Sequence, residues 1–85
     1  MKLDPTDMKP VLNRLRRAQG QLAAVIRMVE EADDCERTIT QLAAVSSALD
    51  RAGFTIIAST LERCARQEEP ELDRAQLEKL FLSLA

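Results

Sequence analysis

No proline interrupts the sequence between Pro10 and Pro70, and this run constrains the fold more than any other feature. A proline inside a helix removes a backbone hydrogen bond and clashes with the preceding turn, so a long helix needs such a run. From Asp33 onward, apolar residues recur at helical spacing, namely Ile39, Leu42, Val45, Leu49, Ala52 and Ile56. The pattern predicts one helix of about 33 residues, about 50 Å long at 1.5 Å per residue.

An earlier helix is predicted over residues 8–29 by a heptad stripe. Its members alternate at spacings of four and three, which places them on one helix face. They are Val11, Leu15, Ala18, Leu22, Val25 and Val29. The acidic residues that follow form a polar break, and Asp33 with Glu36 has the form of a capping box that starts the long helix.

A third, shorter helix is predicted over residues 71–84, after Pro70 ends the long one. Its apolar side carries Leu72, Leu77, Leu80, Phe81 and Leu84. Apolar residues make up 46% of the chain but aromatic residues only 2%, as is typical of Leu- and Ala-rich helix seams. We therefore expect an all-α chain with a single domain over residues 1–85.

A partner subunit is expected because 85 residues bury only a modest share of their apolar surface when they fold alone. The long helix also exceeds what the first helix can cover. The longest uncharged apolar-rich stretch, residues 52–61, is far shorter than the roughly 20 residues that cross a bilayer. The N-terminus lacks the apolar core of a secretory signal. We expect a cytoplasmic protein that does not contact membranes.

Cys35 and Cys64 lie at opposite ends of the predicted long helix. They are 29 positions apart, which corresponds to about 43 Å of rise and almost eight whole turns. They therefore project from the same face but cannot meet within one chain. If two copies packed antiparallel through that face, a twofold axis near Leu49 and Asp50 would place Cys35 opposite the partner's Cys64. The same axis would pair Leu42 with Ile57, Val45 with Phe54 and Ser46 with Gly53.

Two interpretations of the cysteines are open. They could be ordinary small apolar side chains at helix ends. In a reducing compartment, however, paired cysteines are more often reactive or metal-binding groups than a structural disulfide. Cys35 lies near the positive end of the helix dipole, which favours the thiolate, although neighbouring carboxylates oppose it. We interpret Cys35 as the attacking thiol and the partner's Cys64 as the resolving thiol. Enzyme activity is disfavoured because the chain contains no His, Tyr or Trp.

The charge is unevenly distributed along the chain. The net charge is −2, but residues 1–29 carry six basic and two acidic side chains, whereas residues 30–85 carry six and twelve. Arg14, Arg16 and Arg17 alternate with seam residues, so several of them point outward. This face could simply be solvated, or it could contact duplex phosphates. No aromatic residue is interleaved, so base stacking is not expected.

Five motifs follow one another along the chain: RLRRxxGQ from Arg14, MVEE from Met28, Cys35, QLxAVxxALD from Gln41 and LxxC from Leu61. In this order they resemble the copper-sensitive operon repressor family, CsoR/RcnR, over residues 11–67. The resemblance implies an antiparallel dimer of three-helix protomers, assembled as a dimer of dimers, that represses a promoter until an inducer binds.

The resemblance also implies which residues contact double-stranded operator DNA. Arg14 and Arg51 stand where the family places basic residues for this contact, and Arg16 and Arg17 extend the patch. No helix-turn-helix is implied, because the family binds the duplex through a face of its assembled helices.

The family's copper sensors have a Cys, His, Cys site in which the histidine lies four residues before the second cysteine. That position here is Thr60, and the chain has no histidine, which disfavours nickel and cobalt sensing. The formaldehyde-responsive branch usually lacks the second cysteine, so Cys64 argues against it. The Cys, non-His, Cys pattern is similar to the sulfur-transferase repressor branch, CstR, which responds to persulfides and polysulfides.

We therefore expect a persulfide or polysulfide inducer that bridges Cys35 and the partner's Cys64 and lowers DNA affinity. No cofactor or metal is expected on this hypothesis. The alternative within the family is a copper(I) sensor in which the same two thiolates coordinate the metal linearly. From another class, the chain could be a helical scaffold or a thiol peroxidase-like enzyme, although the residues disfavour an enzyme. Salt-sensitive duplex binding would separate a repressor from a scaffold.

Overall fold

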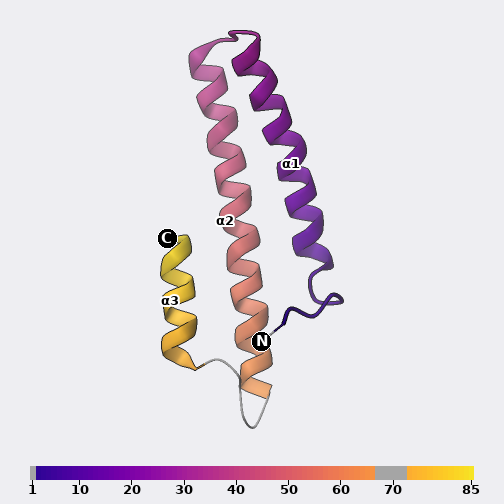
Figure 1. Cartoon of the computed structure of the whole chain (residues 1–85), viewed down its shortest axis with the longest axis vertical. Helices are drawn as coiled ribbons and strands as arrows, with labels where there is room; N and C mark the ends of the chain where they lie inside the picture. The colour runs from indigo at the N-terminus through magenta and orange to yellow at the C-terminus, as the bar shows by residue number, and fades with distance from the viewer. Residues whose placement is uncertain (1, 67–72) are drawn as a thin grey trace.

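The computed structural model describes residues 2–66 and 73–85 and consists of three helices (Figure 1). α1 spans Lys9–Glu30, α2 spans Cys35–Arg66 and α3 spans Arg74–Leu84. The described residues form no strand, so the all-α prediction is confirmed. α1 and α2 begin and end within a few residues of the predicted helices. The first two residues predicted for the third helix, including Leu72, lie outside the described residues.

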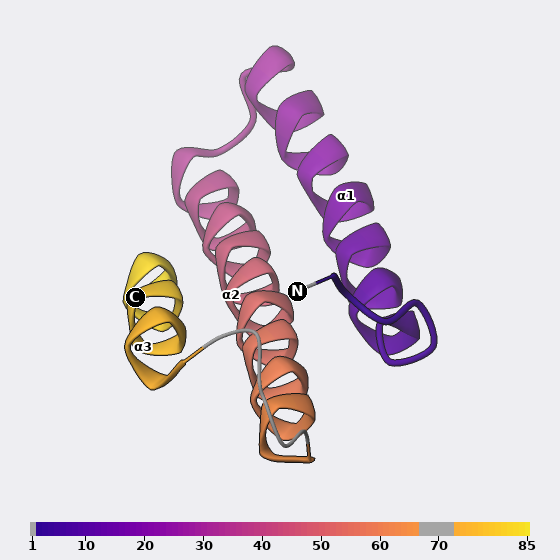
Figure 2. The ribbon, with the colours of Figure 1, turned by 60° about the horizontal axis from the view of Figure 1, so that its bottom comes forward.

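α2 is the central element, with α1 packed along one side of it and α3 on the other (Figure 2). α1 and α2 form an antiparallel hairpin, and α3 lies beside the C-terminal half of α2 (Figure 1). α1 and α3 do not contact each other within the described residues. The molecule measures 54 × 25 × 13 Å, so it is a thin slab rather than a sphere. None of its described helices is both long and apolar enough to cross a membrane.

α1 ends in a left-handed turn that also decides where α2 begins. Ala32 has φ 53°. Its N–H donates to the carbonyl of Val29 at 3.2 Å, and the N–H of Asp33 donates to the carbonyl of Met28 at 2.9 Å. This pair of bonds is the Schellman pattern that closes a helix C-terminus. The backbone of Asp33 therefore belongs to the end of α1.

The capping box predicted on Asp33 and Glu36 is wrong by one position. Asp34 is the N-cap, because its carboxylate accepts the N–H of Arg37 at 2.9 Å and its carbonyl accepts the N–H of Thr38 at 3.0 Å. The reason is the Schellman turn at the end of α1, in which the N–H of Asp33 bonds to the carbonyl of Met28. A capping box does occur at α3, where the side chain of Asp73 accepts the N–H of Gln76 and the side chain of Gln76 accepts the N–H of Asp73.

The hairpin core is narrower than the predicted apolar stripes. Of the α1 stripe, Val11, Ala18 and Val25 are buried. Leu15, Leu22 and Val29 are exposed, with Leu22 at 41%. On α2, Val45 and Ala52 are buried, whereas Ile39, Leu42 and Leu49 are exposed. A helix with one neighbour buries only the arc that faces that neighbour, so half of each predicted stripe remains uncovered.

Many large apolar side chains of α1 and α2 are exposed. We call six of them the open apolar face, namely Leu15, Leu22 and Ile26 on α1 and Ile39, Leu42 and Leu49 on α2. On each helix their spacing places them within one arc. Exposed apolar side chains that gather on one helix face indicate an interaction site, or they lead to aggregation.

Candidate functional site

Cys35 is the first residue of α2 and its thiol is exposed. The turn closed by Ala32 and the cap formed by Asp34 together place it at the helix start. The first N–H groups of a helix have no partner within the helix, so the thiol lies next to backbone donors and the positive end of the dipole. It is therefore accessible to a reagent from solution.

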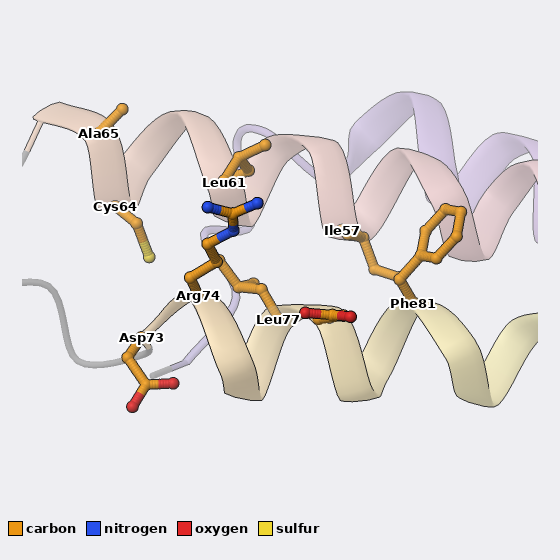
Figure 3. Close-up of a pocket in the computed structure, with 9 residues that line it drawn as sticks. Ile57, Leu61, Cys64, Ala65, Asp73, Arg74, Leu77 and Phe81 are labelled. Carbon is orange, nitrogen blue, oxygen red and sulfur yellow. The ribbon is translucent and has the colours of Figure 1, made fainter.

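Cys64 lies near the other end of α2 and is only 8% exposed. Its sulfur is directed toward α3 (Figure 3). It lines an apolar groove of about 780 Å³ between the two helices, together with Ile57 and Leu61 from α2 and Leu77 and Phe81 from α3. The thiol thus faces an apolar groove covered by α3 and not open solvent.

The two thiols cannot meet within one chain. Both are free, and α2 is a continuous helix of 32 residues that separates them by nearly its whole length, about 43 Å. This confirms the sequence argument that any bridge between them must join two chains. Among the described residues, no three His, Cys, Asp or Glu side chains converge in a way that could hold a metal ion.

α3 occupies part of the α2 face that the predicted dimer pairing requires. The ring of Phe54 packs against that of Phe81 with centroids 5.3 Å apart, and Gly53 lies directly beneath Leu84. The predicted pairings of Gly53 and Phe54 with a second chain therefore do not fit this arrangement. Val45 does not fit either, because it is 3% exposed and belongs to the hairpin core.

Three of the four arginines predicted to contact DNA converge. Arg14 and Arg17 from α1 and Arg51 from α2 line a pocket of about 230 Å³ with Ala48. The side chain of Arg14 donates a hydrogen bond to the hydroxyl of Thr55 at 3.3 Å, which links the two helices at this point. Between residues that the structure describes, the one salt bridge joins Arg37 to Asp33. No carboxylate of the described residues therefore forms an ion pair with these three guanidinium groups.

Arg16 does not join this cluster. Two residues along a helix correspond to a rotation of about 200°, so Arg16 leaves α1 on the side away from Arg14. It lines neither of the pockets to which the other three contribute. If Arg16 contacts DNA as predicted, it does so from a different part of the surface than Arg14, Arg17 and Arg51.

Two polar residues that were not predicted from the sequence lie beside the arginines. A second pocket of about 350 Å³ shares Arg17, Ala48 and Arg51 with the first and continues to Gln21 and Ser47. We call the two pockets together the arginine cleft. A signal was available in the sequence, because Gln21 follows Arg14 by seven residues and therefore lies on nearly the same helix face.

The chain is similar to a family of transcriptional regulators and to several of its members. Residues 7–84 match the family described as metal-sensitive transcriptional repressor. The chain is 42% identical over 65 residues to the copper-sensing transcriptional repressor CsoR of Mycobacterium ulcerans (strain Agy99), which covers 75% of this chain and 56% of that protein. It is 36% identical over 58 residues to the copper-sensing transcriptional repressor RicR of Mycobacterium tuberculosis (strain ATCC 25618 / H37Rv), covering 68% and 60%.

A third relative is the uncharacterized protein YrkD of Bacillus subtilis (strain 168). It is 45% identical over 40 residues, which cover 47% of this chain and 64% of that protein. The chain thus spans less than two thirds of the length of each of these relatives. No solved structure matches it.

Proposed function

Because the chain belongs to the metal-sensitive transcriptional repressor family, we propose that it represses transcription by binding duplex DNA through the arginine cleft. The family is one of regulators and not of enzymes, in agreement with the expectation from the sequence. The observation that carries the proposal is the convergence of Arg14, Arg17 and Arg51 from two helices. Guanidinium groups suit phosphates because they donate two parallel hydrogen bonds to them.

DNA binding is tested by selecting a duplex from a random pool and measuring affinity by fluorescence anisotropy at several salt concentrations. Arg14→Ala and Arg51→Ala should each weaken binding at least tenfold and reduce the salt dependence. Arg27→Ala removes the same charge from α1 outside the cleft and should change affinity less than threefold. No duplex binding even at low salt would contradict the proposal and favour a helical scaffold.

The assembly we propose is a dimer that covers the open apolar face, and two such dimers joined as a tetramer. Ile39, at 61% exposure, and Leu42 lie on the N-terminal half of α2, where no helix of the same chain covers them. An antiparallel partner would bury them and bring its own Cys35 toward the C-terminal end of α2. Light scattering of the wild type and of Leu42→Glu tests this assembly, since the substitution should yield monomers.

We further propose that the inducer is a persulfide or polysulfide. The Cys35 thiolate attacks the outer sulfur of a persulfide R–S–SH, becomes Cys35–S–SH and releases RS⁻. The thiolate of the partner's Cys64 then attacks Sγ of Cys35, which breaks the bond to the outer sulfur, expels hydrosulfide and leaves a disulfide. If a polysulfide inducer leaves the longer chain Cys35–S–S–SH, attack on its middle sulfur expels hydrosulfide and gives a trisulfide bridge. The exposure of Cys35 supports its role as the first thiol to react.

Thr60 supports sulfur chemistry over a three-ligand metal site. It stands at the position that the family resemblance assigns to the copper-binding histidine. Its hydroxyl donates to the carbonyl of Ile56 at 2.9 Å and is largely buried. A hydroxyl held by its own helix is not a ligand for copper(I), which prefers thiolate and imidazole.

Copper(I) sensing through Cys35 and the partner's Cys64 is the second candidate. It is favoured by two relatives that are named as copper-sensing repressors. The deciding experiment repeats the DNA titration with copper(I), peroxide, formaldehyde and an inorganic polysulfide, and follows the polysulfide reaction by mass spectrometry. Loss of DNA affinity with a crosslinked dimer that Cys35→Ser abolishes supports sulfur sensing. Loss with copper(I) alone supports the second candidate.

A further inference from the structure

We propose that Gln21 and Ser47 complete the arginine cleft, so that it holds two consecutive phosphates of one DNA strand. This inference rests on the proposed DNA-binding function and assigns a role to two residues beyond the arginines. The two pockets of the cleft share Arg17, Ala48 and Arg51, and each pocket also has lining residues that the other lacks. Arg14 closes the first pocket, and Gln21 and Ser47 close the second.

Gln21 carries an unsatisfied polar atom at this place. Its side-chain oxygen is buried and has no hydrogen-bond partner among the described residues. Buried polar atoms in folded proteins nearly always have partners, so this oxygen calls for an explanation such as a water or a ligand. Gln21 lines the second pocket of the cleft. The NH₂ group of the same amide is a hydrogen-bond donor, which suits an anion.

Ser47 is free to act as a donor as well. Elsewhere on these helices, hydroxyl groups bond back to the carbonyl four residues earlier, as in Thr40, Thr55 and Ser83. Ser47 forms no such bond in the described structure, and its side chain is exposed. The neighbouring Ala44 and Ala48 carry only methyl groups, which leaves room above α2.

Every polar side chain that lines the cleft can donate hydrogen bonds, and none is acidic. Three guanidinium groups, an amide and a hydroxyl suit an anion with several oxygens. Arg14 and Gln21 are separated by about 10.5 Å of helix rise. Phosphates of one DNA strand rise by about 3.4 Å each along the duplex axis, and because the strand winds around the axis, the distance between neighbouring phosphates is greater than this rise. The cleft is therefore long enough for two phosphates, one near Arg14 and one near Gln21, with Arg17 and Arg51 between them.

The first test compares Gln21→Glu with Gln19→Glu in the full-length chain. Both substitutions add one negative charge to α1, but Gln19 is turned about 200° away from Gln21 and lines no part of the cleft. We expect Gln21→Glu to weaken binding of the selected duplex at least tenfold and to lower the salt slope by about 0.9. Gln19→Glu should stay within twofold of the wild type. Equal losses in both variants would overturn the inference.

The second test needs no duplex and compares a dinucleotide that carries two phosphates, 5′-phosphorylated thymidylyl-thymidine, with orthophosphate. Affinities are read from the side-chain ¹⁵N–¹H shifts of Arg14, Arg51 and Gln21, and we expect the dinucleotide to bind at least fivefold more tightly. Gln21→Leu, with helicity checked by circular dichroism, should remove that preference. If the dinucleotide binds in this way but no duplex does, the duplex proposal fails and the two-phosphate cleft stands. If the duplex binds and the dinucleotide shows no preference over orthophosphate, the inference fails alone.

Discussion

Leu84 packs so closely on Gly53 that a Cβ atom at Gly53 would lie 2.6 Å from Cδ1 of Leu84 and 2.9 Å from its Cδ2. The C-terminal end of α3 therefore rests on a point of α2 that has no side chain. Such a contact allows the two helix backbones to approach closely. The position of α3 therefore depends on the lack of a side chain at Gly53. Because α3 shields Cys64, the burial of that thiol depends on it as well.

Gly53→Leu should release α3 from α2 without unfolding the hairpin. The new side chain would occupy the space of Leu84, whereas leucine itself favours the helix over glycine by up to about 1 kcal/mol. Hydrogen exchange followed by mass spectrometry should show faster exchange in residues 73–85 and little change in α1. The matched control is Gly20→Leu, because a Cβ there meets nothing within 4 Å. Unchanged exchange in α3 would show that Leu84 does not anchor it.

Phe81→Ala should expose Cys64. Phe81 forms part of the groove wall and packs on Phe54, so its loss weakens the docking of α3. In the Cys35→Ser background, we expect alkylation of Cys64 by a maleimide to accelerate at least fivefold. Leu82→Ala is the control, since Leu82 is 62% exposed on the same helix. Fast alkylation already in the parent would mean that α3 does not protect the thiol.

Ala32→Gly should stabilise the chain. Ala32 has φ 53°, a left-handed conformation that costs an L-residue roughly 1–2 kcal/mol. Glycine avoids this cost but loses more entropy on folding, about 0.5–1 kcal/mol. We expect a net gain of about 0.5–1 kcal/mol in the free energy of unfolding, measured by urea denaturation. A clear loss would indicate that the methyl group of Ala32 makes a contact that outweighs the strain.

Asp34→Ala should destabilise α2 more than Asp33→Ala does. The Asp34 carboxylate caps the helix through the N–H of Arg37, and such a cap contributes roughly 0.5–2 kcal/mol. The Asp33 side chain accepts the N–H of the adjacent Asp34 at 2.6 Å and forms an ion pair with the exposed Arg37 at 3.4 Å, and surface ion pairs contribute about 0–1 kcal/mol. Paired urea denaturation curves measure the difference. A larger loss of unfolding free energy for Asp33→Ala would indicate that Asp33 caps α2, as the sequence predicted.

The distance between the two thiols was predicted correctly, because it depends only on spacing along one helix. The separation of Cys35 and Cys64 follows from their spacing on one continuous helix, and the structure confirms it. The pairing partners proposed for Val45 and Gly53 were wrong, because spacing does not reveal that α1 covers the first and α3 the second. Similarly, Arg16 was grouped with Arg14 and Arg17 as a neighbour in sequence, whereas helix rotation separates it from them.

The sequence alone determined the helices, their approximate ends and the distance between the thiols, because hydrogen bonds within one helix link residues only four positions apart. Proline, acidic breaks and apolar periodicity act on that local scale. The tertiary structure decided which apolar residues are covered, that α3 shields Cys64, and that Gln21 and Ser47 join the arginines. All three outcomes depend on how one helix is rotated relative to another about its axis. That rotation is determined by packing between residues far apart in the chain.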